Sequence, residues 1–161
     1  MRVTIGSWLI ECDPEATCRC YTEIAERYSC DCAPCRNFAA LGLAAFPAKA
    51  HEILNELGID FYKPAEIYHI SRLKKGLQLY GGWYHCVGHI ESGSDAWQPA
   101  AGAAAAARDL YSLHPEALTE HFSIGCTSRV ALVPKAFAGY PVIQIEFSAE
   151  LPWVLDEPEP E

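Results

Sequence analysis

The chain has 161 residues, of which half are apolar or aromatic and a fifth are charged. This is the size and composition of one compact domain that can bury a core without disulfide staples. The formal charge of −9 repels phosphate backbones, so we expect no nucleic-acid partner. The same acidity suits a protein partner with a basic surface.

The first ten residues are too polar for the apolar core of a secretory signal, and Glu11 and Asp13 follow at once. No apolar run approaches the roughly 20 residues that span a bilayer, so we expect no membrane association and a cytoplasmic location. Thiols in a reducing cytosol stay free unless they bind metal or do redox chemistry. The eight cysteines therefore do not predict a disulfide framework.

The N-terminal residues predict a strand followed by a helix. Residues 3–10 are rich in β-branched and apolar side chains, which favours a first strand. Asp13 can cap a helix and Pro14 suits its first position, so a helix is predicted over residues 14–27.

Prolines mark the next two predicted helices. Pro34 is a helix-starting residue, and the helix is expected to continue over residues 37–45. Pro47 begins another helix, which should end at Gly58, the residue type that most often follows a helix.

The second half of the chain is predicted to form antiparallel strands. Residues 66–70, 122–130 and 141–147 read as single strands, and residues 76–91 as a hairpin or one long bulged strand across Gly81 and Gly82. In the last strand, side-chain alternation puts Glu146 on the outward side.

The segments between and after these strands are less regular. Residues 92–107 are expected to form a short helix or a connection. Residues 151–155 should dock on the domain, and the acidic, proline-rich residues 156–161 should fray. The prediction is one α+β domain over residues 1–155, with an antiparallel sheet of about five strands and N-terminal helices packed on one face.

The most informative motif is a cysteine cluster between the first two predicted helices. Six of the eight cysteines lie within the first 35 residues, and three of them form Cys30-x-Cys32-x-x-Cys35. Zinc sites use four ligands in a tetrahedron, and Cys-x-x-Cys is their usual local half. The spacing therefore predicts a zinc site with Cys32 and Cys35 as that half and Cys30 as a third ligand.

A fourth ligand must come from elsewhere in the fold. The candidates are Cys18, Cys20, His85, Cys86 and His89. Strand alternation places His85 and His89 on one face, roughly 13 Å apart, so both cannot bind one ion. We favour His85, because Trp83 and Tyr84 could shape a pocket beside it; Asn37 could orient a ligand there or cap a turn.

Two other interpretations of the cysteines stay open. Cys32-Ala33-Pro34-Cys35 is like the Cys-x-Pro-Cys of thioredoxin-like redox proteins, but the polar, helix-like residues 23–29 precede it where that fold has a buried strand. The cysteines could also only pack as small apolar side chains, since free cysteine is often buried. The chain would then be a small acidic interaction module, as immunity proteins that bind basic toxins are.

Several blocks in order resemble a family of small bacterial proteins of uncharacterised function. The blocks are Cys32-Ala33-Pro34-Cys35-Arg36-Asn37-Phe38, Gly81-Gly82-Trp83-Tyr84-His85, and Gln144-Ile145-Glu146-Phe147 with Leu151-Pro152-Trp153-Val154-Leu155. The resemblance implies a bacterial cytosolic protein and transfers no activity. Because no phosphate loop or nucleophile elbow is present, the sequence favours a non-enzymatic binding or regulatory module with zinc at the cluster.

Overall fold

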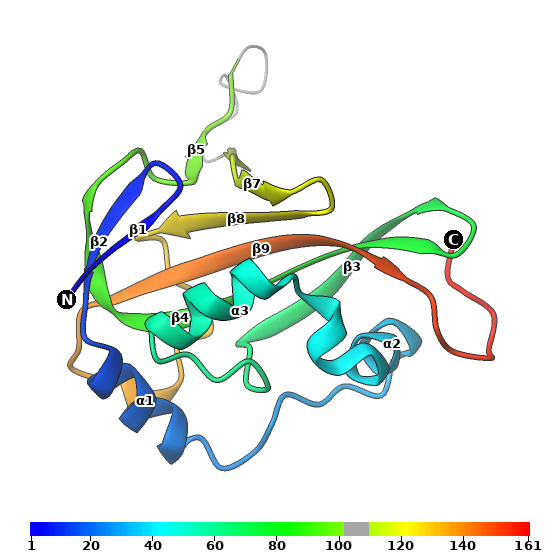
Figure 1. The fold of residues 1–161 in the computed structure, drawn as a ribbon, viewed down its shortest axis with the longest axis horizontal. Coiled ribbons are helices and arrows are strands. Elements are labelled where there is room, and N and C mark those ends of the chain that lie inside the picture. The colour runs from blue at the N-terminus through cyan, green and yellow to red at the C-terminus, as the bar shows by residue number, and fades with distance from the viewer. Residues whose placement is uncertain (102–109) are drawn as a thin grey trace.

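A computed structural model describes residues 1–101 and 110–161 of the chain. It is an α+β fold in which the N-terminal part supplies the helices and a mostly antiparallel sheet follows them (Figure 1). The predicted fold class is confirmed. The described residues form a seven-stranded sheet and a separate two-stranded ribbon, which is more than the five strands expected.

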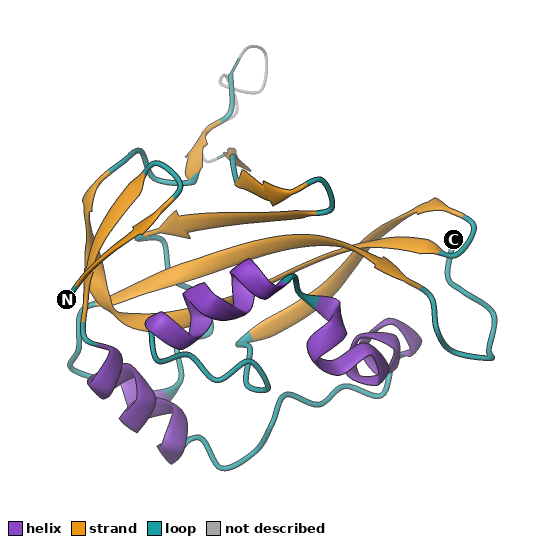
Figure 2. Cartoon of the chain, in the orientation of Figure 1, coloured by secondary structure: helices purple, strands orange, loops and turns teal. Residues whose placement is uncertain are grey.

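The helices are α1 (Pro14–Glu23), α2 (Ala33–Leu41) and α3 (Ala48–Glu56), with 3-10 turns η1 (Gly42–Ala45) and η3 (Lys135–Phe137). The main sheet contains β1 (Arg2–Ile5), β2 (Trp8–Cys12), β3 (Glu66–Lys74), β4 (Leu77–Ser92), β7 (Glu116–Thr119), β8 (Phe122–Thr127) and β9 (Val142–Pro152). The ribbon pairs β5 (Trp97–Pro99) with β6 (Tyr111–Leu113). Figure 2 shows the helices together at one side of the strands.

The predicted N-terminal strand is a hairpin instead of one strand. Ile5 pairs with Trp8, so Gly6 and Ser7 form the turn between β1 and β2. Gly6 has a φ of 54°, which only glycine adopts without steric cost, and this allows the chain to reverse there.

The first helix begins where the sequence predicts and ends earlier. The Asp13 side chain accepts a 2.9 Å hydrogen bond from the Ala16 N–H, as an N-cap residue does. The helix ends at Glu23 instead of residue 27, because Ile24 is extended and packs against the core.

Strand β4 is the centre of the sheet and explains the position of α1. Strand β9 pairs along one edge of β4, while β3 and β2 share the other edge and leave residues 84–87 between them. Helix α1 fills this gap: the Tyr21 hydroxyl accepts from the His85 N–H and donates to the His85 carbonyl, at 3.1 and 3.0 Å. Thr17 Oγ1 accepts from the Val87 N–H at 3.0 Å. Buried backbone groups need such partners, so α1 completes the sheet edge.

Other strands differ from the prediction in length and number. Gly81 and Gly82 lie inside one long strand, which is the second of the two predicted forms, and the turn that precedes it is at Gly76. The strand expected over residues 122–130 ends at Thr127, and the one expected over 141–147 continues to Pro152. Strands β5, β6 and β7 were not predicted because each is short. Residues 102–109, part of the predicted helix or connection, lie outside the described residues.

The C-terminal residues expected to fray are held against the domain. Glu157 forms an ion pair with Arg36 at 2.5 Å, and Glu159 accepts hydrogen bonds from the Gly76 N–H and from Gln78, both at 2.8 Å. The acidic side chains thus find donors on the surface, which the composition alone does not reveal. Among the described residues, none of the helices has the length and apolar character needed to span a bilayer.

Phe46 lies at the centre of the aromatic core that joins the helices to the sheet. Its ring contacts those of Phe38, Phe61, Tyr84, Phe122 and Phe147, with ring centroids 4.7 to 6.3 Å apart. Rings from the helical segment and from β4, β8 and β9 therefore meet on one side chain.

We expect Phe46→Ala to lower the free energy of unfolding by about 3–5 kcal/mol, because it removes a buried ring and leaves a cavity. Leu43→Ala, three residues earlier and 55% exposed, should change it by less than about 0.5 kcal/mol. Urea unfolding followed by circular dichroism measures both. Equal losses would show that Phe46 is not a central packing residue.

Candidate metal centre

The three predicted cysteine ligands converge at the N-terminus of α2. Cys30 lies in the segment after α1, Cys32 is the residue that precedes α2, and Cys35 is in its first turn. Their sulfur atoms all lie within 4.8 Å of one another, and the Cys30 and Cys32 sulfurs are 3.2 Å apart. The spacing of the motif therefore becomes a compact group of three sulfur atoms, which could hold a metal ion.

The dimensions of this group suit a tetrahedral ion. With zinc–sulfur bonds of about 2.3 Å, two thiolates on one Zn²⁺ lie about 3.8 Å apart. The sulfur–sulfur distances, all within 4.8 Å and 3.2 Å for Cys30 and Cys32, are compatible with this value. Small side-chain rotations would bring all three sulfurs to the same distance from a central ion, with one coordination position left.

Cys30 and Cys35 differ in how easily they ionise. Hydrogen bonds from the backbone and the thiol of Cys32 lower the pKa of Cys30. Burial, with the neighbouring thiols of Cys32 and Cys30, raises the pKa of Cys35 to about 12. Cys30 is therefore more readily available as a thiolate than Cys35, which would need the charge of a metal to lose its proton.

Tyr28 anchors the cysteine segment to the sheet. Its hydroxyl donates to the Glu66 carboxylate at 2.7 Å, and it lies 3.9 Å from the Cys35 sulfur. Its backbone N–H donates to the Tyr62 carbonyl at 3.1 Å. Since residues 24–32 contain no helix or strand, these bonds fix the path that carries Cys30 to Cys35.

A cavity of about 270 Å³ lies beside the cluster. Cys30 and Cys35 line it together with the rings of Phe38, Phe61 and Tyr62 and the side chains of Arg27 and Arg36. The Arg27 guanidinium lies over the Tyr62 ring and that of Arg36 pairs with Glu157, so both groups have partners in the described structure. The cavity gives a small molecule or a partner's side chain access to the cluster.

The structure does not bring His85 to the three sulfur atoms. His85 is buried in the middle of β4, its ring lies 5.9 Å from that of Phe137, and burial lowers its pKa. Among the described residues, the group of potential metal ligands contains only the three cysteines.

The other candidates for a fourth ligand also lie outside this group. Cys20 donates to the Ala136 carbonyl at 3.2 Å, Cys18 is exposed on α1, and Cys86 is buried. His89 is 3.4 Å from the Glu11 carboxylate.

The residues predicted to shape a pocket with His85 have structural contacts instead. Asn37 donates to the Tyr80 hydroxyl at 3.2 Å and accepts from the Val154 N–H at 2.7 Å, so it ties the C-terminal segment to α2. The Trp83 indole donates to the Ala131 carbonyl at 3.1 Å, and the Tyr84 hydroxyl donates to the Phe61 carbonyl at 2.9 Å. Some residues that surround the cluster, such as Tyr28, are close to it in sequence and others, such as Phe61, are not, and none of them belongs to a recognised motif.

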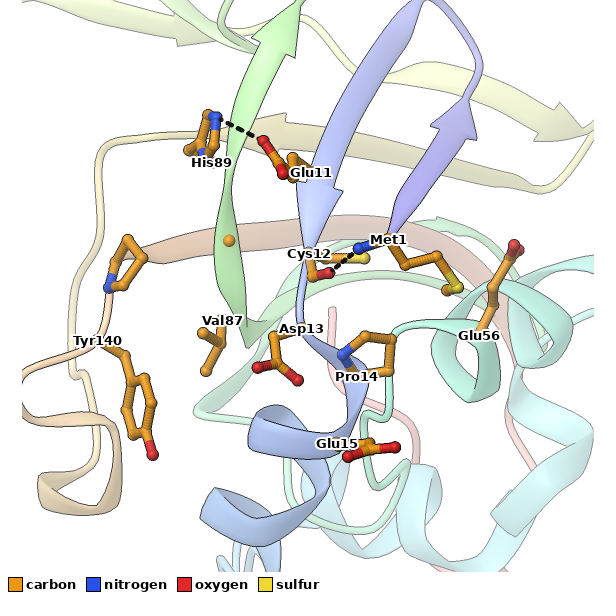
Figure 3. Close-up of a pocket in the computed structure, with 12 residues that line it drawn as sticks. Met1, Glu11, Cys12, Asp13, Pro14, Glu15, Glu56, Val87, His89 and Tyr140 are labelled. Carbon is orange, nitrogen blue, oxygen red and sulfur yellow. Dashed lines mark hydrogen bonds and ion pairs between the residues drawn. The ribbon is translucent and has the colours of Figure 1, made fainter.

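A larger concavity, of about 880 Å³, lies beside the N-terminus (Figure 3). Its lining includes the carboxylates of Glu11, Asp13, Glu15 and Glu56. The amino group of Met1 donates to the Cys12 carbonyl at 2.7 Å. Asp13 is occupied as the cap of α1. This concavity is acidic, in keeping with the net charge, and it lies apart from the cysteine cluster.

In comparisons with known proteins, no family model, curated protein or solved structure matches the chain.

We expect three cysteines to react quickly with iodoacetamide in the native, metal-free protein. Cys18, Cys30 and Cys32 are exposed, and the other five cysteines are buried. Cys30 should react faster than Cys18 at pH 7, because a lowered pKa enlarges its thiolate fraction. Peptide mass spectrometry over time gives each rate. Equal rates at Cys30 and Cys18 would contradict the hydrogen-bonded arrangement of the cluster.

Proposed function

We propose that this protein is a non-enzymatic binding or regulatory module, and that Cys30, Cys32 and Cys35 hold one zinc ion. The observation that carries this proposal is the convergence of the three sulfur atoms within 4.8 Å. Thiolate sulfur is a preferred ligand of zinc, and structural zinc sites commonly contain three or four cysteines.

The proposed ion has a defined effect on the fold. The ion joins the irregular segment after α1 to the first turn of α2. This link lies close to the point where Tyr28 of the same segment is bonded to Glu66 of β3. Binding energy at such a site stabilises the folded state, because the unfolded chain has no preformed site. The ion would also stabilise the segment that lines the 270 Å³ cavity, in addition to the hydrogen bonds of Tyr28.

The fourth coordination position is proposed to be filled by water or by a ligand that enters from the cavity. No histidine of the described residues belongs to the sulfur group, while the cavity reaches two of the three cysteines. An open position is characteristic of zinc sites that exchange ligands. We therefore propose a regulatory rather than a purely structural ion. Reduced thiolates also require the cytoplasmic location inferred from the sequence.

A thiol redox function is the second candidate, and one contact favours it. The Cys30 and Cys32 sulfurs are 3.2 Å apart, and the Cys30 pKa is lowered, as in cysteines that attack disulfides or peroxides. This alternative predicts that mild oxidation of the metal-free protein removes one hydrogen from each of the two thiols and joins them in a disulfide. A reductant should restore both thiols.

Elemental analysis of protein purified under reducing conditions tests the zinc proposal. We expect about one zinc per chain. Cys32→Ser should lose most of the zinc while the protein stays folded, since Cys32 is exposed. Cys18→Ser is the matched control: it removes another exposed thiol outside the cluster and should keep the zinc.

Metal-free wild-type protein, or equal zinc in the Cys32→Ser variant, would overturn the proposal. If that metal-free protein forms a disulfide within residues 30–35, the redox function replaces it.

A further inference from the structure

A polar strip runs along the face of the sheet opposite the aromatic core. Trp83 pairs with Glu146, and His85 pairs with Gln144, across β4 and β9. Directly paired residues of an antiparallel sheet point to the same side, so these four side chains share a face. The intervening residues, such as Tyr84 and Phe147, belong to the core. Glu146, predicted to point outward, does lie on the face away from that core but is only 1% exposed.

Half of the Glu146 carboxyl group has no partner. Oε1 accepts hydrogen bonds from the Trp97 indole at 2.8 Å and from the Gln144 amide at 2.6 Å. Oε2 is buried without a hydrogen-bond partner among the described residues. Burying an unpaired carboxylate oxygen is costly, and this desolvation raises the pKa of Glu146. Such a group in a folded protein calls for a donor that the described residues do not supply.

Three aromatic side chains, all partly exposed, surround this carboxyl group. The Trp97 indole binds it directly, and Trp83 is its neighbour on β4. The Tyr68 ring lies 6.1 Å from that of Trp83, and the pKa of Tyr68 is raised by burial and by the negative charge of Glu146. Gly81 makes room for Tyr68, since a Cβ there would be 2.6 Å from the tyrosine ring.

The segment of residues 128–134 lies beside this group. Ala131 makes two bonds to the strip: its N–H donates to Gln144 at 2.8 Å, and its carbonyl accepts from Trp83 at 3.1 Å. The next residue, Leu132, is 62% exposed and has a φ of 54°, which is unfavourable for a branched side chain. Ser128 donates to the Asp95 carboxylate at 2.7 and 2.8 Å and Arg129 lies over the Tyr111 ring, so these two residues anchor the start of the segment. Entry of a ligand would require the exposed residues 130–133 that follow them to shift.

We propose that Glu146, Trp83, Trp97 and Tyr68 form a second ligand site, which binds the ammonium group of an organic amine. The unpaired oxygen accepts a charge-assisted hydrogen bond, and the aromatic faces attract the cation. A cation fits better than a neutral donor, because it also compensates the buried negative charge of Glu146. The site is independent of the cysteine cluster and does not require zinc.

Titration with n-butylammonium chloride, followed by the indole N–H signals in two-dimensional NMR, tests this site. We expect a saturable shift of the Trp97 and Trp83 indole signals. Neutral 1-butanol and anionic butyrate, which have the same carbon chain, should give no saturable shift of these signals. The binding should weaken as the pH falls and Glu146 takes up a proton, since the site then loses its charge.

Glu146→Gln should weaken butylammonium binding about tenfold or more, because the charge-assisted hydrogen bond is lost. Glu150→Gln is the matched control: it removes the same charge four residues along β9, where Glu150 faces His121 at the surface. It should leave the binding unchanged. Thermal unfolding confirms that both variants are folded.

Three results would overturn the proposal: no saturable shift with butylammonium, equal binding of 1-butanol, or unchanged binding in a folded Glu146→Gln variant. The first of these would mean that the carboxyl group is satisfied by solvent alone. A parallel titration with N-acetyl-lysinamide distinguishes the sources of the amine. Tighter binding than butylammonium assigns the site to a lysine side chain of a basic partner, and weaker binding assigns it to a free amine.

Discussion

The arrangement of this protein depends on the hydrogen bonds of one strand edge. Strand β4 is longer than any neighbour on that edge, so β2 and β3 each pair with only part of it. The peptide groups of His85 and Val87 would be buried without partners if the edge stayed open. Tyr21 and Thr17 supply those partners from α1. The hydrogen bonds of this edge are therefore satisfied only when α1 lies in the observed position.

That position determines where the cysteines lie. Helix α1 packs beside residues 85–87 of β4, and the chain leaves it in extended form at Ile24. Tyr28 then bonds to Glu66 at the start of β3, which leaves only a few residues before Pro34 begins α2. The three sulfur atoms meet because both ends of this short segment are fixed by the sheet. The position of the cluster therefore depends on the contacts of this segment with the sheet as well as on the spacing of the three cysteines.

The parts of the structure that the sequence predicts well are those set by neighbouring residues. Asp13 caps α1, Pro34 begins α2, and Gly58 follows α3 with a φ of 74°, since each acts through its own backbone. The cysteine group is of the same kind: two-residue spacing at a helix start brings sulfur atoms together. The placement of His85 depends instead on tertiary packing. Strand alternation correctly separates it from Tyr84, but both faces of β4 are covered here, so neither side is open to a metal site.

The two proposed sites lie on different sides of the same strand pair. On β3, Ile67 lines the cavity beside Cys35, while Tyr68 belongs to the aromatic group around Glu146. Glu66 accepts the hydrogen bond of Tyr28 and pairs with Trp83 across the strands. Adjacent residues of one strand point in opposite directions, so Ile67 and Tyr68 face different sites without sharing a side chain. The sheet therefore separates the two proposed sites. The soft thiolates of the cysteine cluster lie on one side, and the hard, buried carboxylate of Glu146 lies on the other.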